Sequence, residues 1–260
     1  MTWLRINLFN ICFYVFTFSY AMVIFVACYL VSETRVRKMI AGWGAVTKGL
    51  VRLILGGRVL ILDEHNVPKD RPYIVAPKHQ SELDVAVIFR QHWNCNAVVM
   101  QELADLPFLG KFIRTLNLIS VSVEGGSQGK TEQIIAGARA AEARGQPILI
   151  YPEGELMALG AKERYKSGVY NIYSNTNLPV LPVAQSLGAI WPKREWNKKP
   201  GRTGAIRYLP PIEPGLGKEE FMAKLEDMVE SETMALIRQH ATGAELAAAE
   251  DRYARGAANE

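Results

Sequence analysis

The sequence predicts an α/β protein: a mixed, largely parallel sheet flanked by helices, behind an N-terminal transmembrane and interfacial helical anchor. Two patterns support this fold class. From residue 58 to residue 240, short apolar segments alternate with longer amphipathic segments, as expected of strands joined by crossover helices. Before them, residues 8–31 contain no charged side chain and are rich in Phe, Ile, Val and Tyr. A helix of that length can cross the hydrocarbon core of a bilayer.

We expect residues 1–57 to form the membrane anchor. A cleaved signal peptide is the alternative, but its apolar core would be shorter and would be followed by small residues. One cation, Arg5, precedes the apolar segment, whereas three cations follow it within residues 35–38. The positive-inside rule therefore predicts that the rest of the chain lies on the cytoplasmic face of the cell (inner) membrane. Residues 35–55 continue as a basic amphipathic helix, which either lies in the membrane interface or packs on the domain.

Residues 58–240 are expected to form one domain, in which residues 103–110 are an apolar loop. The alanine-rich, polar residues 241–260 are expected to be a solvated tail. The predicted strands are 58–63, 73–76, 97–100, 118–123, 147–151, 180–184 and 206–209, and the predicted helices are 85–89, 111–116, 131–144, 165–173 and 218–240.

The composition narrows the class of function. The chain has 260 residues, of which 49% are hydrophobic, and a net charge of +4. This mild positive charge suits an anionic membrane surface or a phosphorylated substrate and is too small to indicate nucleic acid binding. The three cysteines, Cys12, Cys28 and Cys95, do not have the spacing of a zinc site. No metal or prosthetic group is indicated, and reduced thiols fit a cytoplasmic domain.

The segment from Lys78 to Asp84 joins a predicted strand to a predicted helix. Ser81 and Asp84 have the three-residue spacing of a helix start, which places His79 at the strand end and Asp84 in the first helical turn. Histidine exchanges a proton near neutral pH, and a carboxylate on its other ring nitrogen would fix the tautomer. The pair could equally be a surface histidine beside a capping acid, so the spacing alone leaves both interpretations open.

Residues 124–131, with the sequence EGGSQGKT, resemble a nucleotide-binding P-loop. The first glycine of that motif would fall at Glu124, where a carboxylate has the wrong charge beside phosphates. Gly125 comes one residue too late. We therefore expect a glycine-rich turn that leads into a helix, and a P-loop nucleotide hydrolase is the disfavoured alternative.

Four motifs occur in order along the domain. They are His79-Gln80-Ser81-Glu82-Leu83-Asp84; Gln101-Glu102-Leu103 with Leu106-Pro107 and Gly110; Tyr151-Pro152-Glu153-Gly154, followed by Tyr165-Lys166-Ser167-Gly168; and Leu181-Pro182-Val183-Ala184. In order and spacing they resemble the motifs of the 1-acylglycerol-3-phosphate acyltransferase family of glycerolipid acyltransferases, which read H-x-x-x-x-D, K-E-L…P…G, F-P-E-G-T-R and a proline-containing strand.

The resemblance implies a membrane-bound O-acyltransferase. Such an enzyme moves a fatty acyl chain from acyl-CoA or acyl carrier protein to the free hydroxyl of a lysolipid, here most directly 1-acylglycerol-3-phosphate, giving phosphatidic acid. His79 would be the general base, Asp84 would orient it, and a backbone N–H near Gly154 would stabilise the oxyanion. The acyl donor is a co-substrate, and no cofactor is implied. Substrate contacts are expected at Gly110, Glu153, Gly154, Lys166 and Pro182.

Two basic positions of the family are missing. No arginine follows the strand at 119–123, and Gly154 is followed by Glu155 and Leu156 and not by threonine and arginine. In the family these arginines are thought to hold the phosphate of the acceptor, a task for which a bidentate guanidinium is suited.

Three explanations stay open. The acceptor could be a lyso-ornithine lipid, whose amino group would pair with Glu124 or Glu155. The protein could instead be a non-catalytic lipid-binding membrane protein. Otherwise another cation holds the phosphate, and the candidates are Lys166, Arg164 and Arg114.

Aromatic and basic side chains cluster between Trp191 and Lys199. This cluster docks on lipid headgroups or on an acidic carrier protein, or it is an ordinary solvated loop. His92 and His240 have no evident partner in the sequence and are expected at the surface.

Overall fold

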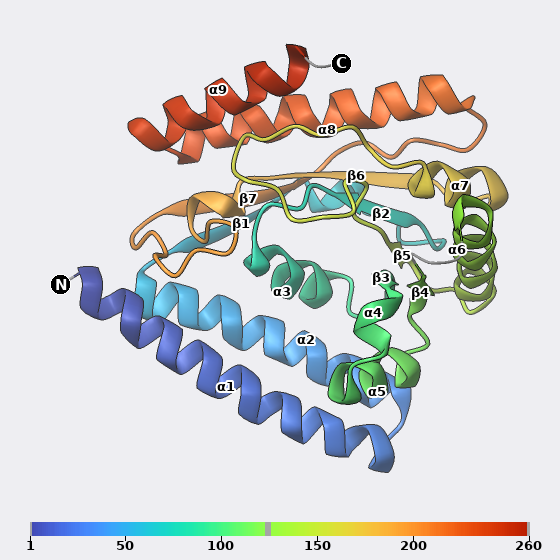
Figure 1. The fold of residues 1–260 in the computed structure, drawn as a ribbon, viewed down its shortest axis with the longest axis horizontal. Helices are drawn as coiled ribbons and strands as arrows, with labels where there is room; N and C mark the ends of the chain where they lie inside the picture. Colours follow the sequence, from blue (N-terminus) through green and yellow to red (C-terminus); the bar gives the residue numbers. More distant parts are fainter. Residues whose placement is uncertain (1, 123–125, 259–260) are drawn as a thin grey trace.

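The computed structural model describes residues 2–122 and 126–258 (Figure 1). Their strands form a seven-stranded sheet in the order β1-β7-β6-β2-β5-β3-β4. Paired strands are parallel except β6 and β7, which are antiparallel. The predicted α/β class with a mixed, largely parallel sheet is therefore confirmed. The strands are β1 (Arg58–Leu62), β2 (Ile74–Pro77), β3 (Asn96–Met100), β4 (Ile119–Val121), β5 (Ile148–Leu149), β6 (Val180–Gln185) and β7 (Thr203–Tyr208).

Helices cover both faces of the sheet (Figure 1). Successive side chains of a strand point to opposite faces, and β2 shows this clearly. Val75 belongs to the apolar core shared with α3, whereas Ile74 and Ala76 belong to the core shared with α6, α7 and α8. These helices are α3 (Glu82–Gln91), α6 (Gly126–Ala143), α7 (Gly168–Asn175) and α8 (Lys218–His240).

Two short helices occupy most of the loop predicted at residues 103–110. They are α4 (Gln101–Ala104) and α5 (Pro107–Thr115). Pro107 stands in the first turn of α5, where its missing N–H leaves no hydrogen bond unmade. Gly110 allows α5 to approach α4, because a Cβ at this position would lie 2.0 Å from the Ala104 carbonyl oxygen.

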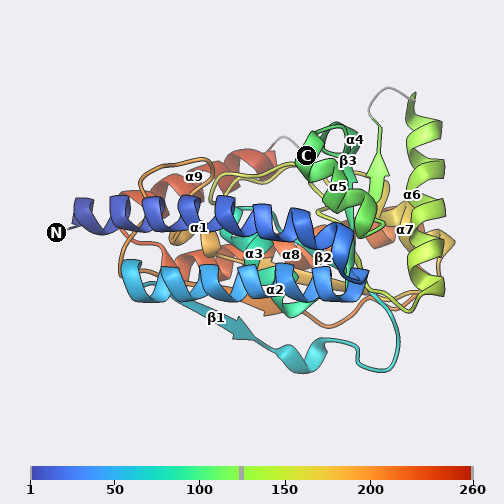
Figure 2. The same ribbon diagram turned by 90° about the horizontal axis from the view of Figure 1, so that it is seen from below.

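The two N-terminal helices run antiparallel along one side of the domain (Figure 2). α1 (Thr2–Leu30) leads into α2 (Glu33–Leu50), which ends in a π-helical turn, η1 (Val51–Leu55). A Cβ on Gly44 of α2 would lie 2.2 Å from the Ala86 carbonyl oxygen of α3. The buried Arg37 guanidinium donates to the carbonyl oxygens of Cys95 and Leu116, both at 2.5 Å. The amphipathic helix therefore packs on the domain.

The predicted solvated tail is wrong for most of its length. Residues 244–258 form α9 (Ala244–Ala258), which lies beside α8 (Figure 1). Ala249 is fully buried in an apolar cluster with Met234 and Ile237 of α8. Leu246 and Tyr253 pack on the same cluster, and their three- and four-residue spacing from Ala249 puts all three on one helical face.

Candidate active site

The junction between β2 and α3 brings a histidine and a carboxylate together. Ser81 is the N-cap of α3, and its hydroxyl oxygen accepts the Leu83 N–H at 3.1 Å. In return the Asp84 carboxylate accepts the Ser81 N–H at 3.1 Å. This capping box is the arrangement predicted from the three-residue spacing. It holds the Asp84 side chain over the start of the helix, beside His79.

The Nδ1 atom of His79 lies 3.1 and 3.0 Å from the two carboxylate oxygens of Asp84. The Asp84 side chain is fully buried. It also accepts hydrogen bonds from the Gln80 N–H (3.0 Å), the Gln185 side-chain amide (2.7 Å) and the Tyr151 hydroxyl (3.2 Å). A carboxylate with so many donors is held as an acceptor, so Nδ1 of His79 carries the ring proton and Nε2 is the basic nitrogen.

The surroundings of His79 suit a base. Burial lowers its pKa, but the hydrogen bond to Asp84 and the nearby carboxylate charges outweigh burial, so the pKa is raised from the usual 6.5. The ring stacks on Tyr151 with centroids 4.0 Å apart, and the side chain is 19% exposed. No described residue hydrogen-bonds to Nε2. This nitrogen can therefore take a proton from an approaching hydroxyl.

The Pro-Glu-Gly motif reaches the same junction from the end of β5. Oε2 of Glu153 accepts the backbone N–H of His79 at 2.8 Å, and Oε1 pairs with Nζ of Lys78 at 2.5 Å. Burial raises the pKa of Glu153 to about 7; Lys78 opposes this shift and Glu230 adds to it. The side chain is fully buried, so Glu153 contacts the backbone beside the base and not the solvent where a substrate would enter.

Gly154 forms a tight turn under Lys166. Its φ of +72° is left-handed, a conformation that favours glycine. Its N–H donates to the Tyr151 carbonyl at 3.0 Å, so this particular N–H is not a free oxyanion donor. A Cβ at Gly154 would lie 2.7 Å from Nζ of Lys166, and the Lys166 N–H donates to the Pro152 carbonyl at 2.8 Å. The exposed Lys166 ammonium therefore lies across the motif.

Three other predicted substrate residues are held elsewhere. Gly110 and Arg114 lie on α5, where Nη1 of Arg114 donates to the Ala104 carbonyl at 3.0 Å. Pro182 is buried in β6, in register with Ala76 of β2. None of the three hydrogen-bonds to the histidine or the aspartate among the described residues. Their contacts with a substrate stay predictions.

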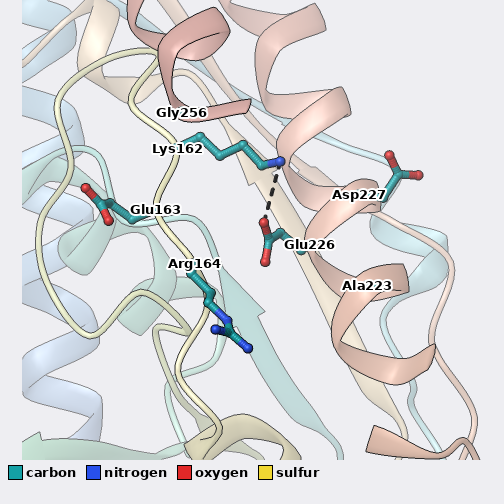
Figure 3. Close-up of a pocket in the computed structure, with 7 residues that line it drawn as sticks. All are labelled: Lys162, Glu163, Arg164, Ala223, Glu226, Asp227 and Gly256. Atoms are coloured by element: carbon teal, nitrogen blue, oxygen red, sulfur yellow. Dashed lines mark ion pairs between the residues drawn. The ribbon is translucent and has the colours of Figure 1, made fainter. Parts of the chain in front are cut away.

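Arg164 lines a separate cavity of about 700 Å³ against α8 (Figure 3). An ion pair between Lys162 and Glu226, with 3.5 Å between nitrogen and oxygen, crosses this cavity. Of the described residues that line it, none belongs to the four motifs. Arg164 is thus the predicted phosphate cation with the least support from the structure.

The glycine-rich segment does not form a phosphate loop where it is described. Gly126 and Gly129 already belong to α6, so their backbone starts a helix and does not wrap an anion. Glu124 and Gly125 lie outside the described residues. Within the described parts of the chain, no group of three or more His, Cys, Asp or Glu side chains could hold a metal ion.

The aromatic and basic cluster of residues 191–199 packs on α1. Trp191 is buried, with its ring 4.8 Å from that of Phe13. Trp196 stays half exposed and stacks on Tyr14 with centroids 5.9 Å apart. The Trp191 carbonyl accepts the Ser81 hydroxyl at 2.6 Å. This loop therefore connects α1 to Ser81, the N-cap residue of α3, and its docking on lipid or carrier protein stays a prediction.

Three residues that shape this site have no role in the prediction from the sequence. Tyr151 supports the His79 ring, Gln185 donates to Asp84, and Lys78 pairs with Glu153. For two of them the sequence holds a local indication of burial beside the site. Gln185 ends an otherwise apolar strand, and Lys78 is a charged residue directly after a buried strand.

Three comparisons identify the family. The model of the Acyltransferase family matches residues 58–186. A 1-acyl-sn-glycerol-3-phosphate acyltransferase of Pseudomonas aeruginosa is 29% identical, over 82% of this chain and 83% of the relative. The mouse (Mus musculus) enzyme named 1-acyl-sn-glycerol-3-phosphate acyltransferase alpha is 26% identical, over 74% of this chain and 67% of its own.

The fold agrees with a solved structure. The 1-acyl-sn-glycerophosphate acyltransferase PlsC of Thermotoga maritima superposes with a TM-score of 0.73 at 23% identity, covering 91% of this chain and 98% of that chain. At this identity the likeness supports the fold, while the sequence comparisons support the activity class. The chain therefore belongs to the 1-acylglycerol-3-phosphate acyltransferase family and is an O-acyltransferase that uses an acyl donor as co-substrate.

Proposed function

We propose that this protein acylates 1-acylglycerol-3-phosphate to phosphatidic acid, with acyl-CoA or acyl carrier protein as the donor. The observation that carries the proposal is the 3.0 Å contact between Nδ1 of His79 and the buried Asp84 carboxylate, which leaves Nε2 without a described partner. Two similar proteins are named 1-acyl-sn-glycerol-3-phosphate acyltransferases, and this supports the choice of acceptor.

The reaction needs no covalent acyl-enzyme. Nε2 of His79 removes the proton from the acceptor hydroxyl as the oxygen attacks the thioester carbonyl, and Asp84 stabilises the resulting imidazolium. When the tetrahedral intermediate collapses, the carbon–sulfur bond breaks and the thiolate takes the proton back from His79. General-base catalysis of this kind contributes about 10²- to 10⁴-fold. The Glu155 N–H, the next amide in the turn, donates to no described residue and is a candidate oxyanion donor.

Lys166 is the proposed partner of the acceptor phosphate. Its ammonium group is exposed and lies over Gly154, one residue from the carboxylate that holds the His79 backbone. A lysine binds phosphate as a point charge, which would replace the missing arginines without their bidentate geometry. Arg114 and Arg164, by contrast, make their contacts away from the motif.

A direct assay tests the chemistry. Membranes containing the protein would receive labelled acyl-CoA or acyl carrier protein, with lysophosphatidic acid or lyso-ornithine lipid as acceptor. We expect phosphatidic acid from the first acceptor, and its loss in His79→Ala but not in His65→Ala, a matched change of an exposed histidine. Acylation of the ornithine lipid alone would refute the phosphate acceptor, and product that is unchanged in His79→Ala would refute the base.

We infer that α1 lies in one leaflet of the membrane, parallel to its surface. By length and composition, α1 is the one described helix that could cross a membrane. The domain contacts both of its ends: the Trp196 indole donates to Asn7 at 3.2 Å, and Nζ of Lys111 lies 4.0 Å from the Tyr29 ring centroid. From residue 7 to residue 29 a helix rises about 33 Å, and the hydrocarbon core is about 30 Å thick. A spanning α1 would therefore place these two contacts on opposite sides of the bilayer.

The outward face of α1 supports this placement. Eight of its twelve exposed large apolar side chains recur at three- and four-residue spacing, the pattern of one helical face: Leu4, Leu8, Ile11, Val15, Phe18, Met22, Val26 and Tyr29. A carboxylate in this face should lower vesicle binding. We expect Phe18→Glu to weaken binding about tenfold or more, since burial of a Phe side chain contributes about 2 kcal/mol.

The control is Ala247→Glu, which adds the same charge to an exposed position of α9, on the other side of the sheet (Figure 1). Both variants would be measured by flotation with vesicles that contain anionic lipid. Equal binding of Phe18→Glu and the unaltered protein would contradict the proposed orientation.

A further inference from the structure

Directly before the catalytic histidine, Lys78 is fully buried. Its ammonium group lies 2.5 Å from Glu153, 2.7 Å from Glu230 and 2.8 Å from the Ala161 carbonyl oxygen. A buried lysine is unfavourable unless it is paired and hydrogen-bonded, and here the ammonium group donates to Glu230 and Ala161 and forms an ion pair with Glu153. The stabilising arrangement is complete, although Lys78 lies outside the motifs that mark the family resemblance.

The second carboxylate comes from the opposite side of the domain. Glu230 projects from the middle of α8, where Val229, Thr233 and Met234 are also buried. One of its oxygens receives both the Lys78 ammonium and the Tyr165 hydroxyl, the latter at 2.8 Å. Helix α8 thus contributes a negative charge to the cluster around Lys78, and no local sequence pattern predicts this contact.

This cluster reaches the base through one peptide unit. Glu153 uses one oxygen for Lys78 and the other for the His79 N–H. The carbonyl of the same peptide, that of Lys78, accepts the side-chain amide of Gln185, which also donates to Asp84. Both polar atoms of the 78–79 peptide are therefore held by side chains that are themselves buried and paired.

We propose that Lys78 and Glu230 are positioning residues, which hold the Glu153 carboxylate in place and thereby fix the backbone of His79 for catalysis. This inference rests on the proposed role of His79 as the base. Neither residue touches the substrate; each acts through Glu153. Misplacement of a reacting group by about 1 Å can lower the rate about 10²-fold. Loss of this clamp, by which we mean Lys78, Glu153 and Glu230, should therefore lower the rate measurably.

The charges around Glu153 make the clamp sensitive to pH. Lys78 and His79 face it from the β2–α3 junction, Tyr165 from the loop before α7, and Glu230 from α8. The negative charge of Glu230 raises the pKa of Glu153. Replacing Glu230 by the isosteric Gln keeps an acceptor for Lys78 and Tyr165 but lowers the pKa of Glu153, so Glu153 stays ionised to lower pH.

The first test is a pair of single variants and their double. In Lys78→Met two buried carboxylates lose their cation, and we expect kcat to fall about 10²-fold while the KM for the acceptor changes less than about twofold. In Lys78→Met with Glu230→Gln, the Gln amide can donate to Glu153, and we expect about tenfold recovery of kcat. A double variant no better than Lys78→Met would overturn the clamp.

The second test is the pH profile, which a purely structural residue would not shift in this direction. We expect Glu230→Gln to move the acid limb of kcat/KM to lower pH by about one unit. An unchanged limb, or one moved to higher pH, would overturn the proposal. This variant also serves if Lys78→Met does not fold.

A matched control lies one helical turn away on α8. The ion pair of Lys162 with Glu226, drawn in Figure 3, has side chains that are 13% and 16% exposed and joins the loop before α7 to α8. Lys162→Met with Glu226→Gln should keep kcat and the pH profile within about twofold of the unaltered protein. Effects equal to those at Lys78 would show general destabilisation and overturn the proposal.

A readout without turnover separates this inference from the proposed function. Diethyl pyrocarbonate modifies unprotonated imidazole, and peptide mass spectrometry reports the rate at His79 against pH. We expect the profile of His79 to move to higher pH in Glu230→Gln, because a Glu153 that stays ionised raises the pKa of His79, and to stay in place in the control. If the unaltered protein acylates no acceptor, the proposed function fails, and this measurement still decides on the clamp.

Discussion

Replacement of Asp84 by Asn should reverse the polarity of the contact that makes His79 a base. Oδ2 of Asp84 is surrounded by three N–H groups, from Gln80, Ser81 and Gln185. The amide nitrogen of Asn cannot occupy that position and must take the Oδ1 position, 3.1 Å from Nδ1 of His79. An N–H there opposes a proton on Nδ1, which keeps one acceptor in the oxygen at the Oδ2 position, 3.0 Å away. The ring proton therefore shifts toward Nε2, and the attacking hydroxyl more often meets a donor in place of an acceptor.

The magnitude follows from two losses. The tautomer that removes the proton becomes the minor one, and the imidazolium formed in the reaction loses its counter-charge. Together these remove general-base catalysis, about 10²- to 10⁴-fold, which corresponds to about 3–5 kcal/mol of transition-state stabilisation. In the well-studied serine protease triad the same exchange lowers kcat about 10⁴-fold. The Asn variant keeps the shape of the side chain, so we expect it to fold.

The assay is the initial rate of acyl transfer from labelled donor to lysophosphatidic acid, with kcat and KM measured between pH 5 and 9. Residual activity of Asp84→Asn should have its acid limb at lower pH, because the aspartate raises the pKa of His79. Glu82→Gln is the control, a charge change in the same helical turn without a hydrogen bond to His79; its charge raises the pKa of His79 less than Asp84 does, so its acid limb should move less. If Asp84→Asn keeps more than about a tenth of the activity, the tautomer argument is refuted.

Three further predictions concern the turn, the acceptor and acid stability. Gly154→Ala should lower the free energy of unfolding by about 1–2 kcal/mol, since φ is +72°. It should also raise the KM for the acceptor, because the new Cβ displaces Lys166. Thermal unfolding measures the first effect and kinetics the second, and unchanged values for both would contradict the left-handed turn. Lys166→Met should lower kcat/KM for lysophosphatidic acid about tenfold or more through loss of a charged contact, whereas Arg164→Met should change it less than about twofold; the reverse order would move the phosphate to the cavity beside α8. Burial lowers the pKa of His92 from 6.5 to about 4. Its contribution to the free energy of unfolding is therefore complete above pH 6.5 and falls by about 3 kcal/mol as the pH is lowered toward 4. His92→Gln should flatten this part of the pH dependence measured by denaturant unfolding, and an equal slope in both proteins would refute the neutral buried histidine.

The sequence predicts the contact between His79 and Asp84 because its geometry is local. Ser81 and Asp84 are three residues apart, and a helix start of that spacing folds the carboxylate back on its own. The alternation of strands and helices likewise depends on periodicities that are visible in short windows. The α/β class and the His79–Asp84 contact could therefore be predicted, apart from the strand order, which local patterns do not encode.

Contacts between distant segments could not be predicted. His92 was expected at the surface and is buried between the hydroxyls of Tyr73 and Tyr208, at 2.9 and 3.1 Å. The Glu230 partner of Lys78 is 152 residues away in the sequence. In both cases a polar residue is buried because tertiary partners satisfy it, and single-segment hydrophobicity cannot reveal such partners. The small side chains of α9 concealed its packing for a related reason, since alanine contributes little apolar signal.

The apolar face of α1 determines how this enzyme would meet its substrates. Transfer of a lysolipid with a sixteen-carbon chain from a bilayer into water costs a free energy of about 12 kcal/mol, at about 0.8 kcal/mol per methylene. With α1 in the interface as proposed, the acceptor is never extracted into water, and the enzyme searches for it by lateral diffusion in two dimensions. The relevant concentration is then the mole fraction of lysolipid in the leaflet. Diluting the acceptor with inert lipid should slow the reaction even when its bulk concentration is constant.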